Sequence, residues 1–206
     1  MSSREDILAR VRRNQPASRA LPEIPMFDTG PPASFAAFSA SLERMGGRVV
    51  AKAEPAGVDA VIRDLFPDAR VVCSSVSEVA GNRPLEAIAR PQDLDDVDVG
   101  VVRALFGVAE TGSLWLSEEQ FRVNALGFLA QHLVVLLDPR AVVVNLHHAY
   151  RYAGFASARY AVFMTGPSAT ADIEGVLIHG AQGIRTLTVV PVVRDQVLPL
   201  GIGLSV

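Results

Sequence analysis

The amino-acid sequence predicts an α/β protein built on a mostly parallel, doubly wound sheet. Short runs rich in Val and Leu alternate with amphipathic segments along most of the chain. This order is typical of parallel strands that are covered by helices on both faces. The chain has 206 residues, half of them hydrophobic, which is enough to bury a substantial core without disulfide bonds. We therefore expect one principal domain preceded by a short N-terminal extension.

The N-terminal extension is expected to hold a helix and an arm. Ser3 is positioned to cap residues 4–13, in which Ile7, Leu8 and Val11 have helical spacing, and this predicts a short amphipathic helix. Residues 15–32 contain five prolines, and such density removes backbone donors and disfavours helix. We expect the N-terminal helix and Pro-rich arm over residues 1–33 and the α/β domain over residues 34–206.

The elements of the α/β domain follow from hydrophobic periodicity and turn residues. Ser34 is positioned to cap a helix over residues 35–45, and Gly46 and Gly47 can end it. A second helix over residues 57–66 stops at Pro67. Later helices are expected at residues 119–130, 146–157 and 170–178. The expected strands are residues 48–51, 70–75, 97–102, 107–116, 133–137, 142–144, 161–164 and 187–193.

Charge and cysteine content exclude several classes of protein. The formal net charge of −3 has the wrong sign for a nucleic-acid-binding protein, which needs a clustered basic face. Cys73 is the single cysteine and cannot by itself ligate an iron–sulfur cluster or a Cys-rich zinc ion. The charged first residues do not fit a signal peptide, and no apolar stretch has the length of a membrane span. We therefore expect a cytoplasmic protein without a cofactor of its own.

The first candidate site interrupts an apolar strand and consists of Glu110, Thr111, Gly112 and Ser113. A buried glutamate has a raised pKa and suits a general base, or it accepts bonds from backbone amides. Gly112 is typical of a bulge or of a point where a ligand approaches the backbone. The pattern favours a strand-end turn and a site equally, with Glu110 as the candidate catalytic residue.

The second candidate site follows the strand expected at residues 161–164, and its binding residues are Gly166, Pro167, Ser168, Thr170, Asp172 and Glu174. The functional interpretation is that free amides of this turn, with two hydroxyl groups, hold a carboxylate or a phosphate. The alternative is a helix capped by Ser168 or Thr170. The two carboxylates in the first turn of that helix argue against a bare anion there.

The four histidines do not predict a metal site. His147 and His148 are adjacent, so on a helix their side chains diverge by about 100° and do not readily share a metal ion. His132 precedes a strand, and His179 lies in the loop before the last long strand. Histidines in such places are more often structural than catalytic, and His179 is kept as a second candidate catalytic residue.

Taken together, these motifs resemble the LUD domain of the lactate-utilisation protein C family. The resemblance rests on residues 106–114 (Phe-Gly-Val-Ala-Glu-Thr-Gly-Ser-Leu), 165–174 (Thr-Gly-Pro-Ser-Ala-Thr-Ala-Asp-Ile-Glu) and 179–183 (His-Gly-Ala-Gln-Gly), and it covers about residues 35–193. Two departures are Ala169, where a basic residue is common, and residues 182–184 (Gln-Gly-Ile), which replace a His-Gly-Pro turn.

The resemblance implies a sheet similar to that of the sugar-phosphate isomerase and CoA transferase superfamily. It also implies a role in oxidising L-lactate to pyruvate, beside partner proteins that hold iron–sulfur clusters. Our first hypothesis is thus an accessory subunit that binds a small organic acid or a partner chain. The alternative is a stand-alone enzyme that acts on a sugar phosphate or a CoA ester, with Glu110 as base or nucleophile. A scaffolding protein is a third hypothesis, and the Pro-rich arm suggests a homo-oligomer.

Overall fold

The principal sheet has five strands that are all parallel, as the sequence predicts. A computed structural model of the chain describes residues 3–29, 33–50, 54, 57–172 and 174–195. Within them the strand order is β1-β11-β6-β3-β2. The strands are β1 (Arg48–Val49), β11 (Thr186–Pro191), β6 (His132–Leu137), β3 (Val99–Arg103) and β2 (Val72–Ser74). Their carboxyl ends lie at one edge of the sheet.

A second sheet of four strands packs on the first and has the order β7-β4-β5-β8. Its strands are β7 (Val142–Val143), β4 (Phe106–Val108), β5 (Ser113–Ser117) and β8 (Ala161–Met164). The single strand predicted over residues 107–116 is wrong, because β4 and β5 form an antiparallel hairpin. Gly112, in the turn just before β5, has a φ of 70°, a conformation that suits glycine.

Apart from the N-terminal helix, the predicted helices that form are shorter than the periodicity indicates. Those of regular length are α1 (Ser3–Arg13), α2 (Phe35–Arg44) and α3 (Val58–Leu65). The short ones are η2 (Leu85–Ala87), η3 (Pro91–Leu94), α4 (Glu118–Phe121), α5 (Leu126–Leu129), α6 (Leu146–Ala149) and α7 (Gly154–Ser157).

Two predicted helices are each divided into two turns. Arg122 has a φ of 60° between α4 and α5, a value that no right-handed helix contains. Between α6 and α7 the ring of Tyr152 folds over Gly154, where an added Cβ would lie 2.2 Å from a ring carbon. Local conformation thus interrupts segments whose hydrophobic spacing is helical.

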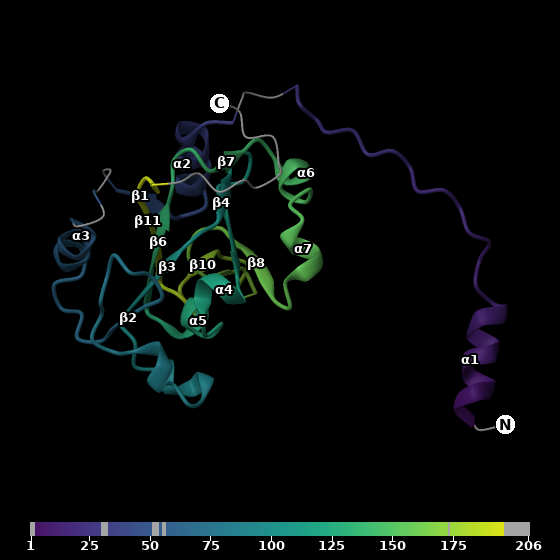
Figure 1. Ribbon diagram of the computed structural model, residues 1–206, viewed down its shortest axis with the longest axis horizontal. Helices are drawn as coiled ribbons and strands as arrows, with labels where there is room; N and C mark the ends of the chain where they lie inside the picture. Colours follow the sequence, from purple (N-terminus) through teal and green to yellow (C-terminus); the bar gives the residue numbers. More distant parts are fainter. Residues whose placement is uncertain (1–2, 30–32, 51–53, 55–56, 173, 196–206) are drawn as a thin grey trace.

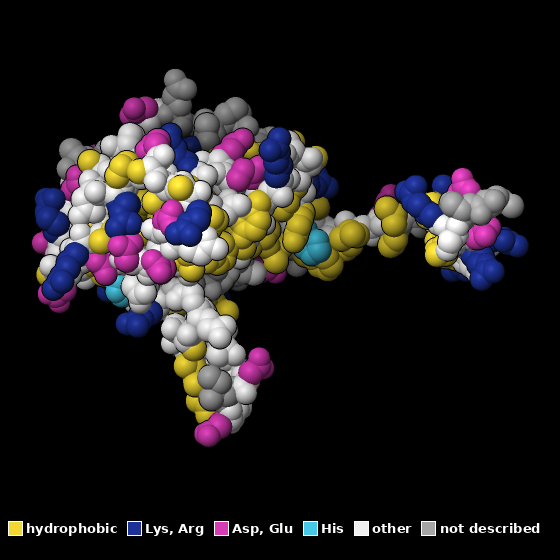
Figure 2. All heavy atoms as spheres, turned by 90° about the horizontal axis from the view of Figure 1, so that it is seen from below, with side chains coloured by type: hydrophobic (Ala, Val, Ile, Leu, Met, Phe, Trp, Pro, Cys, Tyr) yellow, Lys and Arg dark blue, Asp and Glu magenta, His cyan; other side chains and the backbone are white. Residues whose placement is uncertain are grey.

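The predicted helix at residues 170–178 is wrong, since this segment forms a hairpin. Its strands are β9 (Ala169–Thr170) and β10 (Ile178–His179), and they pair antiparallel. Glu174 and Gly175, in the segment that connects these strands, have φ values of 55° and 69°, which lie outside the range of a right-handed helix. The hairpin projects from the body of the molecule as a finger (Figure 2).

The core consists of layers on both sides of the principal sheet (Figure 1). One face of the sheet packs against α3. The buried residues of this layer come from both the helix and the strands and include Val58, Ile62, Val99, Val101, Val134 and Leu136. The opposite face of the sheet packs against α2 and the second sheet. The buried residues of this layer come from all three and include Phe38, Leu42, Leu114, Leu133 and Val135. The outer face of the second sheet is covered by α6 and α7 over an aromatic cluster around Trp115 and Phe106. The mostly parallel α/β fold is confirmed, and the second sheet supplies much of the cover on one face.

Candidate functional site

The first sequence motif packs tightly on α2. Gly112 lies so close to this helix that an added Cβ would be 2.2 Å from the backbone nitrogen of Leu42. The hydroxyl of Ser41 donates to the carbonyl of Ala109 at 2.8 Å. The small and polar residues of the β4–β5 turn therefore allow the helix and the hairpin to approach each other.

The structure brings the two sequence motifs together through hydroxyl groups. Ser113 Oγ lies 2.7 Å from Thr111 Oγ1 and 2.5 Å from Thr165 Oγ1. Ser113 is buried, so this chain of three hydroxyls satisfies polar groups in the interior. It joins β5 to the end of β8.

The second motif also packs against α2, at the end of that helix. Gly166 has a φ of 71°, and an added Cβ would lie 2.2 Å from the carbonyl oxygen of Met45. Pro167 and the ring of His179 both lie next to Gly46. Gly112, Gly166 and Pro167 are thus packed against α2 or the turn that follows it, and the exposed His179 lies beside the same turn. Thr111 and Ser113 are joined to this region through their hydroxyl groups.

The remaining residues of the second motif lie in the projecting hairpin. The amide of Ser168 donates to Ile184 O at 3.0 Å, and its hydroxyl donates to Gln182 O. Thr170 Oγ1 accepts from the amide of Asp172 at 3.3 Å, and Glu174 is at the tip. No helix begins at these residues, so the expected cradle of helix N-terminal amides is not formed. A binding role for these side chains stays a prediction.

Glu110 is exposed and lines a cavity of about 420 Å³ beside α2. Its Oε2 accepts from the amide of Leu146 at 3.1 Å, at the first residue of α6. Arg44 and Asn145 line the same cavity, together with Phe27 from the arm. The carboxylate therefore combines a structural contact with access to solvent.

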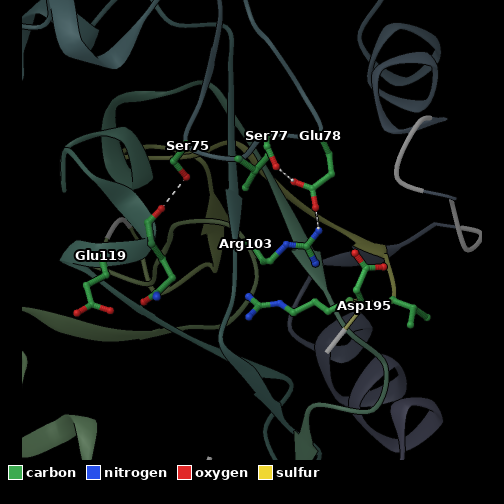
Figure 3. Close-up of a pocket in the computed structure, with 10 residues that line it drawn as sticks. Ser75, Ser77, Glu78, Arg103, Glu119 and Asp195 are labelled. Carbon is green, nitrogen blue, oxygen red and sulfur yellow. Dashed lines mark hydrogen bonds and ion pairs between the residues drawn. The ribbon is translucent and has the colours of Figure 1, made fainter. Parts of the chain in front are cut away.

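A larger cavity, of about 790 Å³, lies at the carboxyl edge of the principal sheet (Figure 3). It is lined by the segment after β2, by the end of β3, by α4 and by the segment after β11; the residues are Ser75, Val76, Ser77, Glu78, Arg103, Glu119, Gln120, Val193, Arg194 and Asp195. This edge is where open parallel sheets bind ligands. Sequence analysis missed all of these residues.

Arg103 and Glu78 form a mostly buried ion pair in this cavity, with side-chain exposures of 11% and 20%. Figure 3 shows the guanidinium of Arg103 pointing at the carboxylate of Glu78, which also accepts from Ser77 Oγ at 3.3 Å. Burial raises the pKa of Glu78, but its backbone hydrogen bond and Arg103 together outweigh burial, so the pKa lies below its usual value. At neutral pH both side chains are therefore charged, and each neutralises the charge of the other.

Arg194 is the second cation of the cavity, and the charges of Asp138 and Glu78 favour its protonated form. Within the described residues its guanidinium makes no hydrogen bond or ion pair, whereas its backbone makes two. Burial, followed by the nearby charge of Arg103, lowers the pKa of Arg194 from its usual value. A half-buried guanidinium beside another cation is stabilised by an anion, and carboxylates fit its planar fork of donors.

Asp138 holds the backbone of this segment in place from the end of β6. It is 3% exposed, and its Oδ2 accepts from the amide of Arg194 at 2.9 Å and from Arg140 Nη2 at 2.7 Å. Burial opposes its charged form, but the hydrogen bonds from Arg140 and Arg194 outweigh burial and lower the pKa of Asp138. The segment that carries Arg194 is therefore fixed to the central strands.

The cavity could have been found from one sequence signal, the polar residues that follow predicted strands. Ser75 and Ser77 follow β2, Arg103 ends β3, and Arg194 follows β11. These positions are far apart in the chain, and only the strand order shows that they share an edge. Among the described residues no group of three or more His, Cys, Asp or Glu side chains could hold a metal ion.

The chain is similar to known proteins in both sequence and fold. Residues 80–192, more than half of the chain, match the family model of the LUD domain. A DUF162 family protein from Deinococcus radiodurans superposes with a TM-score of 0.57 at 16% identity, over 76% of this chain and 94% of that one. This likeness shows the α/β fold alone. No helix in the described part of the chain is long and apolar enough to cross a membrane.

Two curated proteins are distant relatives. Lactate utilization protein C of Geobacillus thermodenitrificans is 24% identical over 148 residues, which cover 67% of this chain and 59% of the relative. An uncharacterized protein of Neisseria meningitidis serogroup B is 25% identical over 129 residues, which cover 61% of this chain and 55% of the relative. The chain thus spans less than two thirds of the length of either relative. By the extent of the family match, it belongs to the LUD domain family.

Proposed function

We propose that this chain is an accessory subunit of L-lactate utilisation that binds a small organic acid in the cavity at the carboxyl edge of the sheet. Membership of the LUD domain family and the relative named lactate utilization protein C support the pathway. The observation that carries the binding site is Arg194, a half-buried residue of the cavity whose guanidinium makes no hydrogen bond or ion pair within the described residues.

Within this proposal the groups of the cavity have distinct roles. Arg194 binds the carboxylate of the organic acid through two parallel N–H donors. Arg103 is neutralised by Glu78, so the carboxylate of the organic acid is bound by Arg194 and not by Arg103. Ser77 and Glu78 supply polar groups for a substituent next to the carboxylate, such as the 2-hydroxyl of lactate.

The electrons of lactate oxidation pass, in this proposal, to iron–sulfur partner proteins. Cys73 is the only thiol of these 206 residues. It is buried, its Sγ donates to Arg83 O at 3.3 Å, and burial raises the pKa of its thiol. A buried, protonated thiol is a poor nucleophile and a poor metal ligand, so this residue has a structural role and the redox centres belong to other chains.

The pathway is tested by deleting the gene and measuring growth on L-lactate and L-lactate oxidation in extracts. We expect both to fall and to recover with the wild-type gene, but not with a gene encoding Arg194→Gln. Recovery with the Arg194→Gln gene to the wild-type level would contradict the binding site. Undiminished growth and oxidation in the deletion strain would contradict the pathway itself.

A second candidate function rests on Glu110, which is exposed at a cavity as a nucleophile or base must be. In this proposal its carboxylate attacks the carbonyl of a CoA ester, and the CoA thiolate leaves. Incubation with acetyl-CoA should then release CoA in one equivalent and add an acetyl mass to the peptide with Glu110. The variant Glu110→Gln should release none. Equal release from both proteins would eliminate this candidate.

A further inference from the structure

The N-terminal helix α1 presents an apolar face that nothing in the described chain covers. Ile7 is 58% exposed, Leu8 is 38% exposed and Val11 is 53% exposed, and their spacing places them on one face. The helix has no buried residue. Figure 1 shows it away from the body, at the end of the extended arm. An isolated helix of 11 residues is marginal in water, so α1 needs a packing partner.

The arm holds α1 at a distance from its own body. The base of the arm is fixed, because Asn145 Nδ2 donates to Met26 O at 2.8 Å and His148 Nε2 lies 2.5 Å from Asp28 Oδ1. The 11 residues 15–25, between α1 and this base, include three prolines. Such a segment is a semi-rigid spacer that spans about 34 Å at about 3.1 Å per residue. This geometry favours contact with another molecule over contact with the body to which the arm belongs.

The finger formed by β9 and β10 is a second unsupported element. Its two strands pair over only two residues each, and a two-stranded hairpin alone is marginally stable in water. Val176 is 60% exposed and Leu177 is 59% exposed. Figure 2 shows the finger projecting from the body on a different side from the arm. It therefore presents a small apolar surface in the segment that connects its two strands.

The two elements carry opposite charges. Helix α1, residues 3–13, contains four arginines and two acidic residues, whereas residues 169–179 contain Asp172 and Glu174 and neither Lys nor Arg. Opposite potentials steer two surfaces together and fix their pairing. Each element thus offers the other an apolar contact with complementary charge around it.

We propose that α1 of one copy of this chain docks on the finger of a second copy. A two-fold arrangement lets each copy give its helix and receive its partner's, so the contact occurs twice and closes the assembly. The docking buries Ile7 and Val11 against Val176 and Leu177, and the arginines of α1 lie near Asp172 and Glu174. This inference does not depend on the proposed function.

Cysteine cross-linking of the full-length chain tests the docking. Chains carrying Ile7→Cys are mixed with chains carrying Val176→Cys under mild oxidation. We expect a cross-linked species of twice the 22.0 kDa chain mass. The matched control replaces Val176→Cys with Arg63→Cys, an exposed residue of α3, and should give at least tenfold less product. Equal yields with both acceptors would overturn the proposal.

Sedimentation of the full-length chain gives a second, independent result. We expect a dimer whose dissociation constant rises at least tenfold with Leu177→Asp and with raised salt, and not with Arg63→Glu. Both substituted residues are exposed, so circular dichroism should be unchanged. A monomer at all concentrations would overturn the proposal, as would a cross-linked monomer of the double variant Ile7→Cys/Val176→Cys, which would place the helix on its own finger.

Discussion

The motifs around α2 and the cavity at the carboxyl edge of the sheet differ in how they treat polar residues. Around α2 the small and polar residues are in contact with one another, as in the chain from Thr111 through Ser113 to Thr165. In the cavity a guanidinium, that of Arg194, has no partner of its own within the described residues. The two sequence motifs therefore have a packing role in this fold. The candidate for ligand binding is instead Arg194, which follows the end of a strand and whose guanidinium has no hydrogen-bond partner within the described residues.

The largest effect should come from Gly112→Ala, which tests the packing role of the first motif. An added Cβ would lie 2.2 Å from Leu42 N, at a φ of 70°. We expect the free energy of unfolding to fall by about 3 kcal/mol, from backbone strain and overpacking together. Denaturant unfolding measures it.

A matched control for that change is Gly175→Ala. This glycine has a φ of 69° but nothing within 4 Å of an added Cβ, so the loss should be only about 1 kcal/mol. Equal losses at Gly112 and Gly175 would show that φ alone matters and that α2 exerts no constraint.

The next largest effect should come from Arg103→Gln, which leaves Glu78 without its ionic partner. Because both side chains are mostly buried, we expect a loss of about 2 kcal/mol in the free energy of unfolding. Arg194→Gln serves as the comparison and should cost less than about 0.5 kcal/mol, since its guanidinium makes no hydrogen bond. A larger loss at Arg194 than at Arg103 would reverse the roles assigned to these residues.

A smaller loss is expected for Ser113→Ala, which breaks the chain of hydroxyls between the two motifs. Removing this buried hydroxyl should cost about 1 kcal/mol, because Thr111 and Thr165 lose a hydrogen-bond partner. Ser157→Ala is the control, since the hydroxyl of Ser157 is exposed, and it should change stability by less than about 0.5 kcal/mol. Thermal unfolding of both variants distinguishes a structural contact from a surface contact.

The smallest effect should be a pH dependence that arises from Asp138. Its pKa is lowered in the folded protein by Arg140 and by the Arg194 amide, against the effect of burial. The unfolded chain therefore binds the proton first, so this contribution is complete above the ordinary pKa of about 3.9 and is lost as pH falls below it. We expect wild-type stability to decline more steeply from pH 5 to pH 3 than that of Asp138→Asn, measured by urea unfolding. Parallel curves would contradict this assignment.

Much of the principal sheet is predictable, because the sequence of each strand is by itself typical of a buried strand. The runs that become β3, β6 and β11 are rich in Val and Leu and are mostly buried, as a sheet covered on both sides requires. The division of residues 107–116 and the finger at residues 169–179 are not predictable in the same way. They depend on positive φ values at Gly112, Glu174 and Gly175, which hydrophobic periodicity does not encode.

The candidate site was only partly predictable for a different reason. Glu110 and the Gly-Pro-Ser turn stand out as short motifs, yet the cavity joins Ser77, Arg103 and Arg194 from three separate strand ends. Each of these residues is unremarkable in its own segment. Their convergence depends on the order β11-β6-β3-β2, which the sequence does not state.

The most direct test of the account is calorimetric titration of L-lactate into the wild-type chain, Arg194→Gln and Glu110→Gln. If the cavity at the carboxyl edge is the organic-acid site, wild type and Glu110→Gln should bind L-lactate equally. Arg194→Gln should bind at least tenfold more weakly, equivalent to about 1.4 kcal/mol. Unchanged affinity in Arg194→Gln, with binding lost in Glu110→Gln, would contradict the account and move the site to the cavity beside α2.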